Sequence, residues 1–214
     1  MPKMTLHIIN ARHQLANMDE WLAERLHDAF SVSAKYLPLR DTDVIVKAGK
    51  AVIPEKGHLG YAPDKGLIYV TVDPENPILR ANPSQSLERM LAHELHHSSR
   101  WDGPGYGHTL GEALVSEGLA GRFAQEAYDG ESEPWEQVPV STLRPYFFKA
   151  QSDWQSTEYN HADWFFGSQE FPAWVGYSLG YQVVGRYLAE NSNARASELV
   201  HADALDFRAF LEAV

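Results

Sequence analysis

The chain has 214 residues, of which 44% are hydrophobic and 22% charged, and it contains no cysteine. This composition is ordinary for a globular domain with its own core, and it excludes disulfides, thiolate metal ligands and a cysteine nucleophile. The net charge of −11 argues against partners that need a basic surface, namely nucleic acid and an anionic membrane. The N-terminal run MPKMTLHIIN is too polar for a signal peptide, and no later run approaches a membrane span, so we expect a cytoplasmic protein.

The first part of the chain, to about residue 80, predicts short strands and one helix. β-type runs lie at Thr5–Asn10, Asp43–Lys47 and Gly66–Asp73, and the last of these (GLIYVTVD) is the clearest strand in the chain. Apolar residues at helical spacing predict a helix over Met18–Tyr36. Glycines and a proline over Gly57–Lys65 predict a loop or a bent hairpin.

The segment Asn82–Trp101 (NPSQSLERMLAHELHHSSRW) predicts a helix whose asparagine is the N-cap and whose proline takes the first helical position. Inside it, His93, Glu94 and His97 spell H-E-x-x-H. Residues four apart on a helix lie about 40° apart around its axis, so the two imidazoles can point at one ion. Glu94 is offset to the side, where it can reach a water held by that ion. This is the pattern of a zinc-protease helix with two ligands and a general base.

A second helix is expected from Thr109 to Tyr128, after the glycine-rich turn DGPGYGHT. Thr109 and Glu112 have the spacing of a capping box. Glu112 and Glu117 compete as the third metal ligand, because they lie about 140° apart around the helix and only one can easily face the ion. Since Glu112 already has a capping role, we predict that Glu117 is the ligand.

The spacing H-E-x-x-H, nineteen residues, then the glutamate of Ser-Glu-Gly-Leu-Ala resembles that of the gluzincin metallopeptidases. Within them, the closest resemblance is to a bacterial family of unknown function described as predicted Zn-dependent proteases. The stretch His93–Phe123 carries most of this resemblance, and WFFG at 164–167 and GYSLGY at 176–181 extend it.

The resemblance implies a single α+β domain over residues 1–214 with a zincin-like (gluzincin) fold. In this fold a small β-rich N-terminal lobe, to about residue 80, packs on a helical C-terminal lobe, with the zinc cleft between them. The implied cofactor is Zn2+, held by His93, His97 and Glu117 with a fourth position open to water. Glu94 would take a proton from this water as it attacks the substrate carbonyl. The implied activity is zinc-dependent hydrolysis of peptide bonds, with a peptide or protein substrate.

Gluzincins also supply a tyrosine or histidine from a later helix to the developing oxyanion. In the predicted helix Pro172–Glu190, Tyr177 is followed by Ser-Leu-Gly, which resembles the Tyr-x-x-Gly stretch of gluzincin aminopeptidases. Tyr177 is therefore the implied donor. Tyr181, His161 and His108 are alternatives, and either tyrosine can instead be a core aromatic.

The resemblance also implies that an edge strand beside the metal helix pairs with the extended substrate backbone. Gly66–Val72 precedes that helix and is the candidate, although it can also be a plain sheet strand. The Gly-x-Met-Glu-Asn motif of the aminopeptidases is absent from the sequence, which disfavours that specificity.

A second departure concerns the partner of the first ligand. Thermolysin-type enzymes place an Asp four residues after the ligand Glu, where this chain has Gly121. An acceptor for His93 must then come from elsewhere, with Asp102 and Asp163 as candidates. His96 would break the i, i+4 geometry as a ligand, so we expect it to support or line the cleft.

Two other functions stay open. One is a zinc-binding scaffold or regulatory protein with little turnover, against which the intact Glu94 argues. The other is a metal-dependent hydrolase of a non-peptide amide or ester. Two histidines and one glutamate also accept several divalent ions besides zinc.

Overall fold

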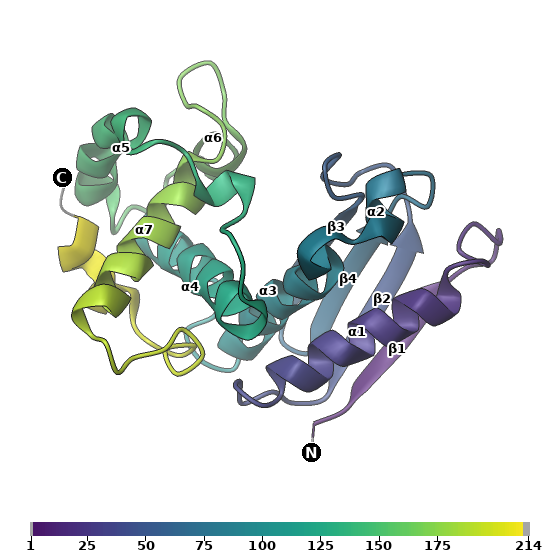
Figure 1. The fold of residues 1–214 in the computed structure, drawn as a ribbon. Coiled ribbons are helices and arrows are strands. Elements are labelled where there is room, and N and C mark those ends of the chain that lie inside the picture. The colour runs from purple at the N-terminus through teal and green to yellow at the C-terminus, as the bar shows by residue number, and fades with distance from the viewer. Residues whose placement is uncertain (1, 212–214) are drawn as a thin grey trace. The chain divides into compact units, whose positions relative to one another are not determined.

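The computed structural model describes residues 2–211 and is an α+β protein with a small mixed sheet and many helices (Figure 1). The expected fold class is confirmed at this level. The chain divides into two compact units, of which the first comprises Met1–Asp102 with Ala127–Gly130 and the second Gly103–Glu126 with Glu131–Val214. None of the helices within residues 2–211 has the length and apolar character needed to cross a bilayer.

The first unit contains a four-stranded sheet in the order β1-β2-β4-β3. Its strands are β1 (Met4–Ile9), β2 (Thr42–Ala48), β3 (His58–Asp64) and β4 (Leu67–Val72). β2 pairs in parallel with both β1 and β4, whereas β3 pairs with β4 in the antiparallel sense. The parallel pair β1–β2 is connected by the helix α1 (Asp19–Ser33), while the antiparallel hairpin needs only a two-residue turn.

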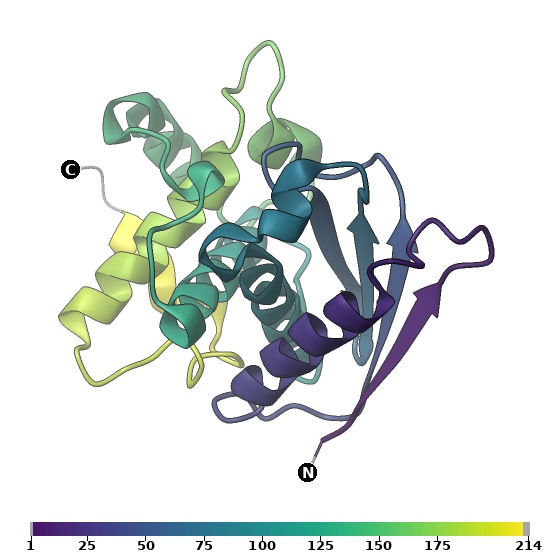
Figure 2. The same cartoon turned by 45° about the vertical axis from the view of Figure 1, so that its right-hand side comes forward.

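One face of this sheet is buried. Alternate residues of its two central strands are fully inaccessible to solvent: Val44, Val46, Ile68, Val70 and Val72. The helices α1 and α3 (Ser86–Arg100) pack beside each other against this face (Figure 2). Their inward leucines are fully buried as well: Leu22, Leu26, Leu87, Leu91 and Leu95. Since each such burial contributes about 1.5–3 kcal/mol, α3 is held firmly on the sheet.

The strand that we expected at the edge, β4, is an interior strand. It pairs with β2 on one side and with β3 on the other, so its main chain has no free side for a peptide. That prediction is wrong. The edge strand beside α3 is β3, which lies in the segment expected to be a loop or bent hairpin. β3 contains Gly60 and Pro63 and a register shift after Tyr61, which are features that sheets tolerate at an edge and that weaken a strand signal.

The helix α3 begins at Ser86, later than we expected from the sequence. A short helix α2 (Pro77–Ala81) comes first, then Asn82 in a left-handed conformation with a φ of 43°, then the 3-10 turn η1 (Pro83–Gln85). The N-cap of α3 is Gln85, which forms no capping hydrogen bond with its side chain. Asn82 still contacts the first turn, because its Oδ1 accepts a hydrogen bond of 2.9 Å from the backbone nitrogen of Leu87. The expected capping residue is therefore wrong, because the intervening turn moves the helix start and places Gln85 at the N-cap of α3.

A buried histidine ties the edge strand to the start of this helix. His58, the first residue of β3, is 2% exposed, and its Nε2 lies 2.9 Å from the hydroxyl oxygen of Ser86. Burial, assisted by the nearby charge of Lys56, lowers the pKa of His58 to about 3. His58 is therefore neutral at physiological pH and acts as a hydrogen-bonding group.

The second unit is helical. Its elements are α4 (Leu110–Tyr128), η2 (Pro134–Glu136), α5 (Val140–Asp153), α6 (His161–Phe166), α7 (Val175–Glu190) and η3 (Ala204–Leu211). Helices α4 and α7 cross with their backbones in contact. A Cβ atom on Gly118 would lie 2.3 Å from the carbonyl oxygen of Gly180, and one on Gly180 would lie 2.0 Å from that of Leu114. The two glycines thus permit a crossing that no other residue would allow.

Candidate metal centre

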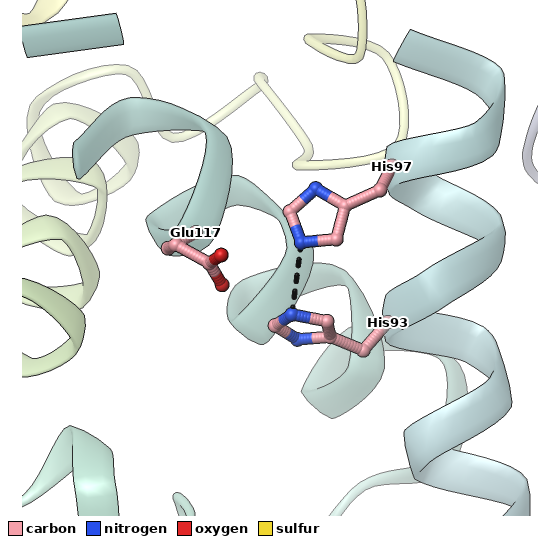
Figure 3. A group of neighbouring side chains, drawn as sticks. All are labelled: His93, His97 and Glu117. Atoms are coloured by element: carbon pink, nitrogen blue, oxygen red, sulfur yellow. Dashed lines mark hydrogen bonds between the residues drawn. The ribbon is translucent and has the colours of Figure 1, made fainter. Parts of the chain in front are cut away.

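The two histidines of the H-E-x-x-H motif point at each other from one face of α3 (Figure 3). Their Nε2 atoms lie 3.0 Å apart, and their rings meet edge to face with centroids 4.7 Å apart. His97 is 6% exposed and His93 is half-buried. Two nitrogens bound to one tetrahedral zinc ion are about 3.3 Å apart, so these rings already have nearly the required separation.

Glu117 of α4 is the third member of the cluster. One ligand atom from each of His93, His97 and Glu117 lies within 4.8 Å of the others, and the carboxylate faces the two rings (Figure 3). Imidazole nitrogen and carboxylate oxygen are the donors available to zinc in a chain without cysteine. Three protein donors with one position left for water are typical of catalytic rather than structural zinc. The donor set therefore fits a zinc ion.

Glu112, the competing glutamate, does not belong to this cluster. Its carboxylate accepts hydrogen bonds of 2.8 Å from the backbone nitrogens of both His108 and Thr109. Its own nitrogen lies 3.3 Å from the hydroxyl oxygen of Thr109, which completes the expected capping box. Burial disfavours the charge on Glu112, but these hydrogen bonds outweigh it and lower the pKa of the carboxyl.

Glu94 lies on α3 between the two histidines and is 8% exposed. Strand β3 passes directly beside it. A Cβ atom on Gly60 would lie 2.5 Å from Cγ of Glu94 and 2.8 Å from its Oε1, distances that real side chains do not adopt. Only glycine at position 60 therefore leaves room for the Glu94 carboxylate where it stands.

A family model described as "Predicted Zn-dependent protease (DUF2268)" matches residues 22–209. The chain belongs to this family. The matched region includes the whole of α3 and α4, and thus all three residues of the metal cluster.

The chain is also similar to a curated protein, although weakly. The "Uncharacterized protein YjfC" of Bacillus subtilis (strain 168) is 27% identical over 167 residues, which cover 70% of this chain and 54% of that protein. The chain therefore spans about half the length of this relative.

Tyr106 also belongs to the site, although no sequence motif indicates it. It lies in the turn before α4, and its hydroxyl donates a hydrogen bond of 2.9 Å to Oε1 of Glu117. Burial, and next the charge of Glu117, raise the pKa of Tyr106 well above its ordinary value, so the hydroxyl keeps its proton. The sequence feature that could have indicated Tyr106 is its position between two glycines, Gly105 and Gly107, which have φ values of 71° and 92°.

Tyr177 and His161, two of the candidate oxyanion donors, belong to one group of aromatic side chains. Phe165 connects them, because its ring centroid lies 5.0 Å from that of Tyr177 and 4.3 Å from that of His161. His161 lies within electrostatic reach of Glu117, and Tyr177 within that of Tyr106. Burial lowers the pKa of His161 while the charge of Glu117 opposes this shift, and Tyr177 contributes to the raised pKa of Tyr106.

Tyr181 has a different environment. It is 6% exposed, its hydroxyl donates to Oε1 of Gln125, and the guanidinium of Arg122 lies 3.5 Å from its ring centroid. These contacts are those of a packing residue. His96 is fully buried and is not part of the metal cluster.

Two other candidate residues, His108 and Asp102, have contacts away from the metal cluster. His108 is exposed, and its backbone nitrogen is engaged by the capping box of Glu112. Asp102, a candidate partner for His93, forms an ion pair of 3.2 Å with Arg40.

Proposed function

We propose that this protein hydrolyses peptide bonds as a zinc metallopeptidase of the gluzincin type. The observation that carries the proposal is the convergence of His93, His97 and Glu117, together with a second buried carboxylate, Glu94, between the two histidines. A structural zinc site has no need of that second carboxylate, whereas metal-assisted hydrolysis requires a base.

His93, His97 and Glu117 would hold the zinc ion, and each would do so as an uncharged imidazole or an ionised carboxylate. A bound zinc ion supplies Lewis acidity, which lowers the pKa of water toward about 7 and polarises a carbonyl group.

The protein's own groups perform the proton transfers. The Glu94 carboxylate accepts a proton from the attacking water and then delivers it to the nitrogen of the leaving amine. General acid–base assistance of this kind is worth about 10²–10⁴ in rate. The Tyr177 hydroxyl is the proposed donor to the oxyanion that develops on the substrate carbonyl, a contribution of about 10²–10³ in rate.

The substrate backbone would pair with the edge strand β3. The backbone nitrogen of Asp73 donates to the carbonyl oxygen of Gly57, while the carbonyl oxygen of His58 accepts from Ile53 on the opposite side. In an antiparallel strand this direction alternates, so the N–H and C=O of Gly60 point away from β4 toward the open edge. An extended peptide can form two main-chain hydrogen bonds there, directly beside the Glu94 base.

The test uses zinc content and peptidase activity of purified wild type, Glu94→Gln and Glu117→Gln, with casein, a peptide library and small esters as substrates. We expect about one zinc per wild-type chain and cleavage of peptides. Glu94→Gln should keep its zinc and lose about 10²–10⁴ in activity, whereas Glu117→Gln should lose zinc affinity as well.

Each contrary outcome has a distinct meaning. Zinc binding without turnover of any substrate would favour a scaffold or regulatory protein. Hydrolysis of esters but not of peptides would favour a non-peptide hydrolase. A wild-type chain that takes up no zinc when it is supplied would overturn the proposal.

A further inference from the structure

The hydrogen bond between Tyr106 and Glu117 points to a role for the turn that precedes α4. We infer that Tyr106 is the positioning residue of the third zinc ligand, and that its hydroxyl sets the affinity of the centre for zinc. This inference rests on the proposed function only in that zinc is the ion bound. Tyr106 acts through Glu117 and does not itself touch the substrate.

The turn around Tyr106 has a specific backbone conformation. Gly105 and Gly107, on either side of it, have positive φ values of 71° and 92°, which other residues rarely adopt. Gly107 also packs against Glu112, because a Cβ atom at position 107 would lie 2.2 Å from Cβ of Glu112. The Glu112 carboxylate in turn holds the backbone nitrogens of His108 and Thr109 at 2.8 Å. The capping box of α4 therefore fixes the same turn that places the tyrosine.

The ring of Tyr106 is restrained as well. It meets the ring of His161 edge to face with centroids 5.8 Å apart, and His161 stacks on Phe165 with an angle of 21° between the planes. Because the ring is packed and the backbone is fixed, the hydroxyl has little freedom to leave Oε1 of Glu117.

The consequence for the ligand follows from carboxylate chemistry. A carboxylate has about four lone-pair sites, and the bond from Tyr106 occupies one of them on Oε1 of Glu117. This bond therefore does not prevent Glu117 from binding an ion. A free glutamate would lose rotamer freedom on binding a metal, whereas Glu117 is already oriented before binding. Residues that hydrogen-bond a metal ligand in this way typically change metal affinity 10–100-fold when they are removed.

The experiment measures the dissociation constant for Zn2+ by competition with a chromogenic chelator, so it does not depend on finding a substrate. Tyr106→Phe removes the hydroxyl and keeps the ring against His161. We expect it to weaken zinc binding about 10–100-fold, while far-UV circular dichroism of the zinc-free protein stays unchanged. Tyr159→Phe is the matched control, because Tyr159 senses the charge of Glu117 but has no hydrogen bond to it. It should leave the zinc affinity unchanged.

A double-mutant cycle separates action through Glu117 from a general effect on the site. In a Glu117→Gln background, Tyr106→Phe should cause little further loss of affinity. The inference is overturned if Tyr106→Phe binds zinc as tightly as wild type, or if it weakens binding equally in both backgrounds. Zinc binding by wild type without peptidase activity would defeat the proposed function and leave this inference intact, whereas a wild type that binds no zinc would overturn both.

Discussion

Gly60 of the edge strand and Glu94 of the metal helix are packed so closely that a single methyl group at position 60 would overlap the Glu94 side chain. The overlap would involve Cγ of Glu94 at 2.5 Å, its Oε1 at 2.8 Å and the sulfur of Met90 at 2.5 Å. The backbone of Gly60 thus limits the positions that the side chain of Glu94, the proposed base, can take. A substitution at position 60 in β3 should therefore move the Glu94 carboxylate.

We therefore expect Gly60→Ala to displace the Glu94 carboxylate while leaving the three metal donors in place. Zinc affinity should stay unchanged, and kcat should fall by up to about 10²–10⁴, the usual contribution of a placed general base. The backbone N–H and C=O remain, so KM should change less than kcat. The measurement is steady-state kinetics on a cleaved peptide together with zinc titration.

The control for this prediction is Gly49→Ala. A Cβ atom there would contact only the Thr71 side chain, at 2.9 Å, away from the metal helix. Its kcat should equal that of wild type. A Gly60→Ala protein with wild-type kcat would show that Glu94 is not positioned by this strand.

Substitutions of Tyr177 and Tyr181 in α7 should have different effects, the first on catalysis and the second on stability. Tyr177→Phe should lower kcat about 10²–10³-fold with unchanged zinc affinity if its hydroxyl stabilises the oxyanion. Tyr181→Phe loses a hydrogen bond to Gln125 and should lower the free energy of unfolding by about 0.5–1.5 kcal/mol without affecting kcat. Kinetics and urea denaturation of both variants test this. A full loss of activity in His161→Ala beside an active Tyr177→Phe would instead identify His161 as the donor.

Glu112 and Glu117 should likewise respond differently to substitution. Glu112→Ala removes the capping interactions at the start of α4 and should cost about 0.5–2 kcal/mol of stability while the protein still loads zinc. Glu117→Ala should lose zinc affinity, because the carboxylate that faces the two histidines is gone. Chemical denaturation of the zinc-free proteins and metal analysis measure the two effects. Loss of zinc from Glu112→Ala but not from Glu117→Ala would contradict the ligand assignment.

Acid should destabilise the first unit through His58. An unfolded histidine gains a proton below a pH of about 6.5, whereas folded His58 stays neutral until its pKa of about 3. Between these values the unfolded chain binds the additional proton, so the free energy of unfolding falls as pH is lowered, by up to about 1.4 kcal/mol per pH unit. Above a pH of about 6.5 His58 contributes no such dependence.

The measurement is urea unfolding of zinc-free wild type and His58→Gln between about pH 5 and about pH 7. Glutamine keeps a hydrogen-bonding group near Ser86 but cannot titrate, so the variant should show a shallower pH dependence. Because the metal-site histidines are common to both proteins, their contribution cancels in the comparison. Parallel pH profiles would mean that His58 is not buried as a neutral group.

Local patterns in the sequence predicted the parts of the protein that depend on neighbouring residues. The i, i+4 spacing of His93 and His97 places both imidazoles on one face of any regular helix, and the structure has them there. The capping box of Thr109 and Glu112 is equally local. Because it gave Glu112 a structural role, the sequence predicted Glu117 as the ligand, and Glu117 is the glutamate that lies with the two histidines. The extents of α1, β1, β2 and α4 also followed from hydrophobic periodicity to within a few residues.

Only the tertiary structure decided which strand is the edge and which side chains surround the site. Strand pairing is non-local, so the apolar run of β4 indicated a strand without revealing that β2 and β3 cover both of its sides. The pattern of β3 is weakened by Gly60 and Pro63, although that same glycine makes room for Glu94. The bond from Tyr106 to Glu117 depends on the path of a glycine turn. Helical spacing is a property of the backbone alone, whereas these contacts arise only when separate segments of the chain pack together.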